Sequence, residues 1–447
     1  RLGHLEVLAQ VHSIFPAEPT LPGARDAAEM AKDRGIALLA LVGAALAVAG
    51  ARLVATHIDI GLVPRLLYAC MAIVAASAVL FRKSRPRDTL MELAGAVHGP
   101  VPDELKARGE RMAAKIAKAR VPVSQEEQLA GLDVTPTPRF EVSDRAWLEH
   151  LDREGYAVVA GVASREALDR AESLLWEFLE EHTTWRRACP DTWSDASYEQ
   201  VGSVQNGLLR EAGVAQSKFL WHVRTLPLVR RAFESIWGTP DLLVSFDGAN
   251  VFRPWHHGFR KTVCGWWHVD QGRGKQGRHA VQGFVTLFAA DATTGCLGAP
   301  LRPLSGGLTV VPRSHLRFDE VVADQGNPSI DYCTVQAYEP VMQELPKRLV
   351  CCQAGDLVLW DSRTVHANSP APKQPVGPRD QLLRAVAYVC MVPQSFAPKD
   401  VRQGRRAAFE HGFSTSHWPQ RLDLGSMGPG PKLSLAEASK EVQDLVG

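Results

Sequence analysis

The apolar segments beyond Asp241 are short and separated by turn residues, and this pattern limits the folds that the chain can adopt. The segments are rich in β-branched and aromatic residues, as strands are, and clusters of Gly and Pro follow them. Many short strands punctuated in this way predict a double-sheet jelly roll or a related barrel. The segments are Leu242–Asp247, Cys264–Asp270, Gln282–Ala290, Gly307–Pro312, Asp356–Asp361 and Leu382–Pro393.

A strand and a helix are predicted just upstream of these segments. Residues 155–162, GYAVVAGV, are typical of a short buried strand. Residues 164–182 predict a helix in which Ser164 is the N-cap. Its apolar residues recur at helical spacing and form one face, which consists of Leu168, Ala171, Leu175 and Phe178.

Two uncharged apolar runs lie near the start of the sequence, at residues 35–50 and 66–81. Each has about 16 residues, slightly fewer than the roughly 20 that span a bilayer. Basic residues flank the pair, while the link between the runs carries few charges, which is typical of a hairpin with both ends in the cytoplasm. We therefore expect a transmembrane helical hairpin over 35–88, membrane association through 35–81, and the following domain on the cytoplasmic side. A pair of buried Ala-rich helices is the alternative.

These features divide the chain into five parts. They are an N-terminal segment 1–34, the hairpin 35–88, a helical linker 89–139, a mainly β domain with flanking helices 140–420, and a C-terminal tail 421–447. The net charge is +1, so the protein has no overall field to attract nucleic acid. None of the eight cysteines forms a CxxC pair, which argues against a zinc ribbon. The sequence defines neither the oligomeric state nor the substrate.

Three His-x-Asp pairs occur in the chain, where about one is expected by chance. The pair at 57–59 falls in the short link of the hairpin. The pair at 150–152 lies in a helical pattern, where positions i and i+2 diverge by about 200°. Only His268 and Asp270 lie on a predicted strand, where alternate side chains point to the same face and can reach one metal ion.

A third metal ligand is predicted at His366, in the segment AGDLVLWDSRTVHANSP. Two histidines and one carboxylate are the ligand set of non-haem Fe(II) oxygenases, whereas zinc more often recruits a third His or Cys, and magnesium more oxygen ligands. A 2-oxo acid can supply electrons at such a site, and its far carboxylate needs a cation. We favour Arg384, which opens the last predicted strand, over Arg379 in the preceding turn.

Residues 140–419 resemble the phytanoyl-CoA dioxygenase family of Fe(II)/2-oxoglutarate-dependent oxygenases. The matching pieces are GYAVVAGVASREALDRAESLL, WWHVDQ, GFVTLFAADATTG, GLTVVPRSH, GDLVLWDSRTVHANSP and LLRAVAYV. Their combination is specific, although each piece alone is not. The resemblance implies a double-stranded β-helix of the jelly-roll or cupin-like type.

The resemblance also implies the chemistry of the site. It places Fe(II) on His268, Asp270 and His366, and 2-oxoglutarate on Arg384 with help from Asn368. The co-substrate O₂ would be used to hydroxylate a small molecule or a lipid, with release of succinate and CO₂, and ascorbate is a further reductant to consider. Members of the family that halogenate lack the carboxylate, so the presence of Asp270 favours hydroxylation.

Some features depart from the family pattern. The segment CLGAPLRPLSG at 296–306 is an insertion, and the interval between His366 and Arg384 is long. A catalytically inactive, membrane-attached binding module and a protein hydroxylase on the same barrel are therefore alternatives. Basic residues in the loop 272–279 are candidate contacts for an anionic substrate group, with a solvated loop as the alternative. They are Arg273, Lys275 and Arg278.

Overall fold

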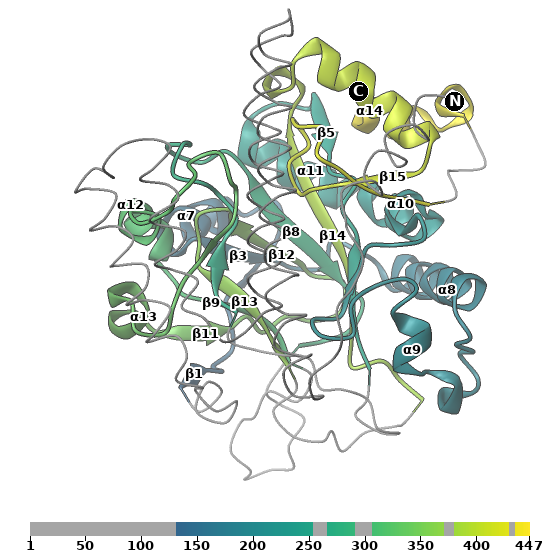
Figure 1. Ribbon diagram of the computed structural model, residues 1–447, viewed down its shortest axis with the longest axis horizontal. Coiled ribbons are helices and arrows are strands. Elements are labelled where there is room, and N and C mark those ends of the chain that lie inside the picture. Colours follow the sequence, from purple (N-terminus) through teal and green to yellow (C-terminus); the bar gives the residue numbers. More distant parts are fainter. Residues whose placement is uncertain (1–130, 254–265, 291–305, 371–379, 429–433) are drawn as a thin grey trace, which may run out of the picture. The chain divides into compact units, whose positions relative to one another are not determined.

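The computed structural model describes residues 131–253, 266–290, 306–370, 380–428 and 434–447, which all belong to one compact unit (Figure 1). The expected transmembrane hairpin, Arg379 and nearly all of the 296–306 insertion lie outside these ranges. Within the described ranges, no helix has both the length and the apolar character needed to cross a membrane.

Two β-sheets form the centre of the described region, as the pattern of short segments predicts. The first sheet has the order β1 (Leu132–Asp133), β11 (Lys347–Leu349), β9 (Gly306–Val310), β13 (His366–Pro370), β7 (His268–Val269) and β10 (Cys333–Thr334). The second has the order β2 (Arg139–Phe140), β3 (Tyr156–Val159), β12 (Leu357–Asp361), β8 (Val281–Thr286), β14 (Arg384–Pro393), β6 (Ala249–Phe252) and β4 (Leu208–Leu209), and β5 (Leu242–Val244) also pairs with β14. All six predicted segments contain a strand, and the two sheets fit a jelly-roll-like fold.

The central strands of the second sheet, β3, β12, β8, β14 and β6, are buried on both faces. Their residues alternate between two cores. On β12, Leu357 and Leu359 join the large core shared with the helices. Their neighbours Val358 and Trp360 join a smaller core that also includes Leu308 of the first sheet. This period of two is the strand repeat, and it explains why these segments are apolar throughout rather than alternating with polar residues.

Helices flank the two sheets on opposite sides (Figure 1). Figure 1 shows α12 and α13 beside the first sheet, and α8, α10 and α11 beside the second. The predicted N-cap is confirmed, since the Ser164 side chain accepts a hydrogen bond from the Ala167 amide at the start of α8. The helices are α7 (Ala146–Glu154), α8 (Arg165–His182), α9 (Asp195–Tyr198), α10 (Lys218–Arg224), α11 (Pro227–Trp237), α12 (Phe318–Val321), α13 (Pro340–Glu344), α14 (Lys399–Glu410) and α15 (Lys440–Val446).

Residues on both flanks of 140–420 pack onto this domain. On the N-terminal side, β1 pairs in parallel with β11, so the described end of the expected helical linker is a strand rather than a helix. On the C-terminal side, β16 (Leu424–Met427) pairs with β15 (Phe413–Thr415). Leu445 and Val446 of α15 are buried in the large core. The described parts of the expected C-terminal tail, 421–428 and 434–447, therefore pack onto the domain.

Candidate active site

The two histidines of the predicted metal set lie side by side on neighbouring strands. His268 of β7 and His366 of β13 are paired in register, and their ring centroids are 4.3 Å apart. Asp270 follows the end of β7, where its backbone amide donates a hydrogen bond to the Ser362 carbonyl at 3.0 Å. One ligand atom from each of these three residues lies within 4.8 Å of the others. The structure thus brings the three predicted ligands together.

Backbone carbonyls fix the orientation of both imidazole rings. Nδ1 of His268 lies 2.9 Å from the Trp266 carbonyl oxygen, and Nδ1 of His366 lies 3.0 Å from that of Thr364. A carbonyl only accepts, so each Nδ1 donates its proton there, and the neutral form of each ring then has its lone pair on Nε2. Both Nε2 atoms face Asp270, at 3.6 Å from Oδ1 and 3.3 Å from Oδ2. This is the arrangement that metal-binding histidines require.

The protonation states at this site also suit a metal ion. Burial, together with the nearby His366, lowers the pKa of His268 to about 4, so its imidazole is neutral at neutral pH. Burial acts to raise the pKa of Asp270, but the surrounding histidines His268, His417 and His366 hold it well below its ordinary value. A neutral His268 imidazole and an ionised Asp270 carboxylate therefore face the centre of the cluster, beside His366. Such a donor set binds divalent transition metals.

Neighbouring side chains hold the three candidate ligands in place. Gln282 of β8 donates a hydrogen bond to Asp270 Oδ2 at 2.9 Å. The Trp266 ring stacks on the His268 ring with an interplanar angle of 11°. Trp360 lies against His366, with centroids 5.4 Å apart. These contacts restrict the rotation of each ligand, which is how a surrounding shell tunes metal affinity.

The cluster opens into a cavity of about 640 Å³ that also contains Arg384. Arg384 lies on β14, is 3% exposed, and donates a hydrogen bond to Asn250. Its guanidinium carbon lies 5.0 Å from the centroid of the Phe284 ring. Its Nη2 has no hydrogen-bond partner in the described part of the chain. No acidic side chain among the described residues pairs with this guanidinium, and such a buried cation is costly unless an anionic ligand binds it.

Two further polar residues lie beside Arg384. Asn368 follows His366 by two positions on β13, so both side chains face the cavity. Tyr388 lies four residues beyond Arg384 on β14 and hydrogen-bonds with Asn368. Burial raises the pKa of Tyr388, so its hydroxyl stays protonated and can donate. The residues present thus offer several donors to a carboxylate, and they fit a dicarboxylate co-substrate beside the metal.

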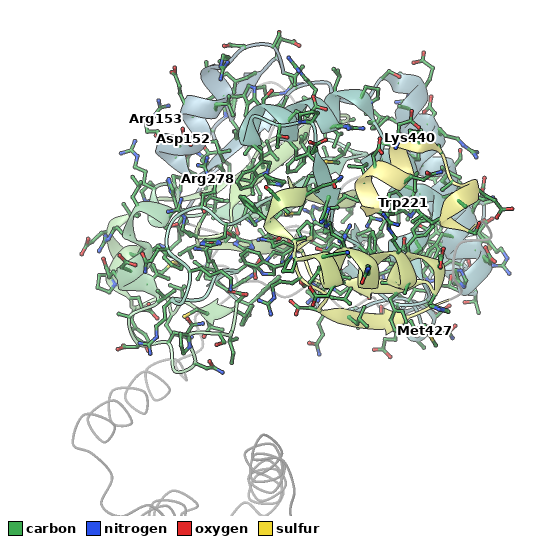
Figure 2. All side chains as sticks on the ribbon, turned by 90° about the horizontal axis from the view of Figure 1, so that it is seen from above. Asp152, Arg153, Trp221, Arg278, Met427 and Lys440 are labelled. Carbon is green, nitrogen blue, oxygen red and sulfur yellow. The ribbon has the colours of Figure 1, made fainter. Side chains whose placement is uncertain are left out.

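The basic side chains of the loop 272–279, which follows β7, do not line this cavity. Arg278 is bound to the buried Asp361 at 2.8 Å and to Asp152 at 2.7 Å, and Figure 2 shows Arg278 close to Asp152. Lys275 is paired with Asp331 at 2.7 Å. The expectation that Arg278 and Lys275 contact an anionic substrate is therefore wrong, because acidic side chains of the protein neutralise them.

Several residues of this site were not identified from the sequence. A buried polar residue inside an apolar strand is a usable signal, and Gln282 on β8 has that signal. Tyr388 shares a strand face with Arg384 at spacing i+4, which is a second such signal. His417, which lies beyond the last predicted strand, also lines the cavity. No local pattern distinguishes His417 from a surface histidine.

Comparison with known proteins supports the chemistry of this site. Residues 151–371 match the family model described as Phytanoyl-CoA dioxygenase (PhyH). The matched range contains the three candidate metal ligands and Asn368, and it ends before Arg384. A curated relative, Ava biosynthesis cluster protein O of Aspergillus versicolor, is 29% identical over 303 residues, which cover 65% of this chain and 90% of that protein.

Solved structures were also found to be similar to this chain. The putative oxidoreductase from Salmonella typhimurium LT2 has a TM-score of 0.44 and 16% identity, and the match covers 82% of this chain and 98% of that one. The non-heme α-ketoglutarate dependent epimerase SnoN from nogalamycin biosynthesis has a TM-score of 0.37 and 18% identity, with coverages of 56% and 82%. The carbocyclase SnoK from the same biosynthesis has a TM-score of 0.39 and 16% identity, with coverages of 57% and 87%.

Iron and 2-oxoglutarate are the cofactors of this family, as the sequence resemblance implied, and a His-Asp-His set suited to the metal is present. Residues 151–371 of this chain form a phytanoyl-CoA dioxygenase family domain.

Proposed function

We propose that this domain is an Fe(II)- and 2-oxoglutarate-dependent oxygenase that hydroxylates a small-molecule substrate. One observation carries the proposal. A convergent cluster of His268, Asp270 and His366 shares a cavity with the buried, incompletely paired guanidinium of Arg384. Such a cavity offers a metal-binding set and an anion-binding group within reach of one small co-substrate.

The three converging residues are the proposed iron ligands. The carbonyls of Trp266 and Thr364 keep both Nε2 lone pairs directed at the ion, and Gln282 orients the Asp270 carboxylate. An ion held by these three residues would keep positions open for co-substrate and O₂. When bound, iron and 2-oxoglutarate supply the oxidation: 2-oxoglutarate loses CO₂, one oxygen atom of O₂ enters succinate, and the other enters a C–H bond of the substrate.

Arg384 is the proposed partner of the far carboxylate of 2-oxoglutarate. Asn250 holds one arm of the guanidinium, which leaves Nη2 available to the ligand. Phe284, Leu308 and Trp360 also line the cavity, and these apolar walls reduce the access of water. A charge-assisted hydrogen bond is stronger in such an environment than at the protein surface.

Hydroxylation is the proposed reaction type because the Asp270 carboxylate is present at the metal cluster. A complete and oriented ligand set supports an active enzyme over a catalytically inactive binding module. A cavity of about 640 Å³ supports a small molecule as substrate, since ligand sites of about 300–1,000 Å³ are typical for such compounds.

The test is succinate formation from 2-oxoglutarate with Fe(II) and O₂. We expect the wild-type full chain to form succinate and the His268→Ala variant to form none above background. His411→Ala is the matched control, because His411 is exposed at the end of α14. Absence of both turnover and Fe(II) binding in the wild type would overturn the proposal.

A further inference from the structure

Part of the cavity described above has a polar wall formed by three separate segments. They are held together by hydrogen bonds, including one from the Ser426 hydroxyl to the Arg210 carbonyl at 2.8 Å. Leu208 is the one large apolar residue among them within the described ranges. We call this set the polar wall, and it consists of Asn206, Leu208, Arg210, Glu211, Asp247, Gly248, Ser414, Thr415, Ser416, His417, Asp423, Gly425 and Ser426.

The polar wall adjoins the metal cluster through His417. This residue lies close enough to Asp270 and His268 to act on them electrostatically. Its Nε2 atom is buried and has no hydrogen-bond partner in the described part of the chain. A buried ring nitrogen beside the reaction site is therefore available to a polar group of a ligand.

The charged residues of the polar wall are mainly acidic. Glu211, Asp247 and Asp423 carry negative charge, and Arg210 is the one basic residue of the set. Asp423 is already paired with Arg421 at 3.0 Å, outside the set. Negative charge that lines a cleft attracts cations and repels anions.

Asp247 is the carboxylate best placed for a ligand. It is half-buried, and its Oδ1 accepts a hydrogen bond from the Gly248 amide at 2.7 Å. In the described part of the chain its carboxylate forms no salt bridge; the buried Arg224 donates to the Asp247 backbone carbonyl at 2.6 Å and interacts with Asp247 only through its charge. A partly desolvated carboxylate with one oxygen occupied by an amide leaves the other for a cationic donor.

We infer that the substrate is a small polar molecule whose protonated amine binds Asp247 and whose other polar groups meet the polar wall. This inference rests on the proposed function, because it names the substrate class of the same cavity. An acyl chain finds almost no apolar surface on the polar wall. A coenzyme A thioester also carries several negative phosphate charges, which Asp247 and Glu211 repel.

The test compares three sets of probes on the Fe(II)-loaded full chain. Amino acids, amino sugars and polyamines are the first set, their N-acetylated counterparts the second, and palmitate with palmitoyl-CoA the third. Stimulated succinate release and an oxygenated product, detected by mass spectrometry, are the readouts. We expect stimulation by at least one amine, and a loss of at least about tenfold in kcat/KM for its N-acetyl counterpart, as for one charge-assisted hydrogen bond.

Asp247→Asn tests the residue itself. The variant keeps an oxygen for the Gly248 amide, and its melting temperature reports whether it is folded. We expect it to raise KM for the amine and to abolish the preference over the N-acetyl counterpart. Asp241→Asn, at an exposed aspartate that does not line this cavity, is the control and keeps the preference.

Stimulation by palmitate or palmitoyl-CoA would overturn the inference. Failure of every amine to stimulate, and an unchanged preference in Asp247→Asn, would overturn it as well. Conversion of 2-oxoglutarate without any substrate separates the two proposals. If that conversion proceeds while no amine stimulates it, the substrate class is wrong and the proposed function stands.

Discussion

Replacement of Arg384 by methionine should abolish most of the affinity for 2-oxoglutarate while changing the ligand-free protein little. In the ligand-free state the change removes a buried guanidinium whose Nη2 has no partner among the described residues, and it leaves Asn250 without its donor. Each effect is about 1–3 kcal/mol, and the two have opposite signs. We therefore expect the free energy of unfolding to change by less than about 2 kcal/mol.

The effect on binding is much larger. Loss of the charged partner of a buried carboxylate costs about 2–4 kcal/mol, which is about 30–1,000-fold in Kd. At a 2-oxoglutarate concentration of about 100 times the wild-type Kd, ligand stabilises the wild type by about 2.7 kcal/mol. The same concentration stabilises Arg384→Met by less than about 0.9 kcal/mol.

Both quantities are measurable on the full chain with Fe(II) under anaerobic conditions, by calorimetric titration and by thermal unfolding. Arg231→Met, at a side chain that is 67% exposed on α11, is the matched control. Arg379→Met is the informative comparison, since Arg379 is the alternative anchor. Wild-type affinity in Arg384→Met, with lost affinity in Arg379→Met, would refute the assignment.

The structure and the sequence also predict four other outcomes. Gln282→Ala should weaken Fe(II) binding about 10–100-fold in equilibrium dialysis, because Asp270 loses its orienting hydrogen bond. Asp361→Ala should lower the free energy of unfolding, measured with denaturant, by about 2–4 kcal/mol, because its partners Arg278 and Arg363 lose a fully buried carboxylate. Burial acts to raise the pKa of Asp361, but those two arginines hold it below the ordinary 3.8. The stabilisation by the Asp361 carboxylate is therefore complete above about pH 3.8 and is lost on further acidification. A pH series of unfolding curves should show less acid sensitivity in Asp361→Asn than in the wild type. The apolar runs at 35–81 predict that carbonate extraction leaves the protein in the membrane fraction, and release into the supernatant would contradict that prediction.

Local patterns in the sequence predicted much of the fold. Strand segments such as 356–361 and the helix at 164–182 are present because apolar periodicity, turn residues and the Ser164 cap act over a few residues. The same short-range rule places His268 and Asp270 on one side of the chain. The order of the segments along the chain therefore indicated both the fold class and the candidate metal cluster.

Contacts between distant segments were not predictable from one sequence. Asn250 reaches Arg384 because β6 pairs with β14, and strand periodicity defines a face but no partner. Arg278 lies in a basic loop that is typical of an anion contact, yet Asp361 neutralises it from 83 residues away. His417 reaches the cavity only because the β15–β16 hairpin folds back over it. These pairings depend on the packing of the whole domain.

We propose that His268, Asp270 and His366 together hold one Fe(II) ion. Equilibrium dialysis under anaerobic conditions, with the iron counted per chain, measures this directly and without any substrate. We predict one ion per chain for the wild type and for His411→Ala. We predict almost no iron for the Asp270→Ala and His366→Ala variants, whose melting transitions show that they are folded. Wild-type protein without iron, or variants of the cluster that bind iron as tightly as the wild type, would refute this iron site.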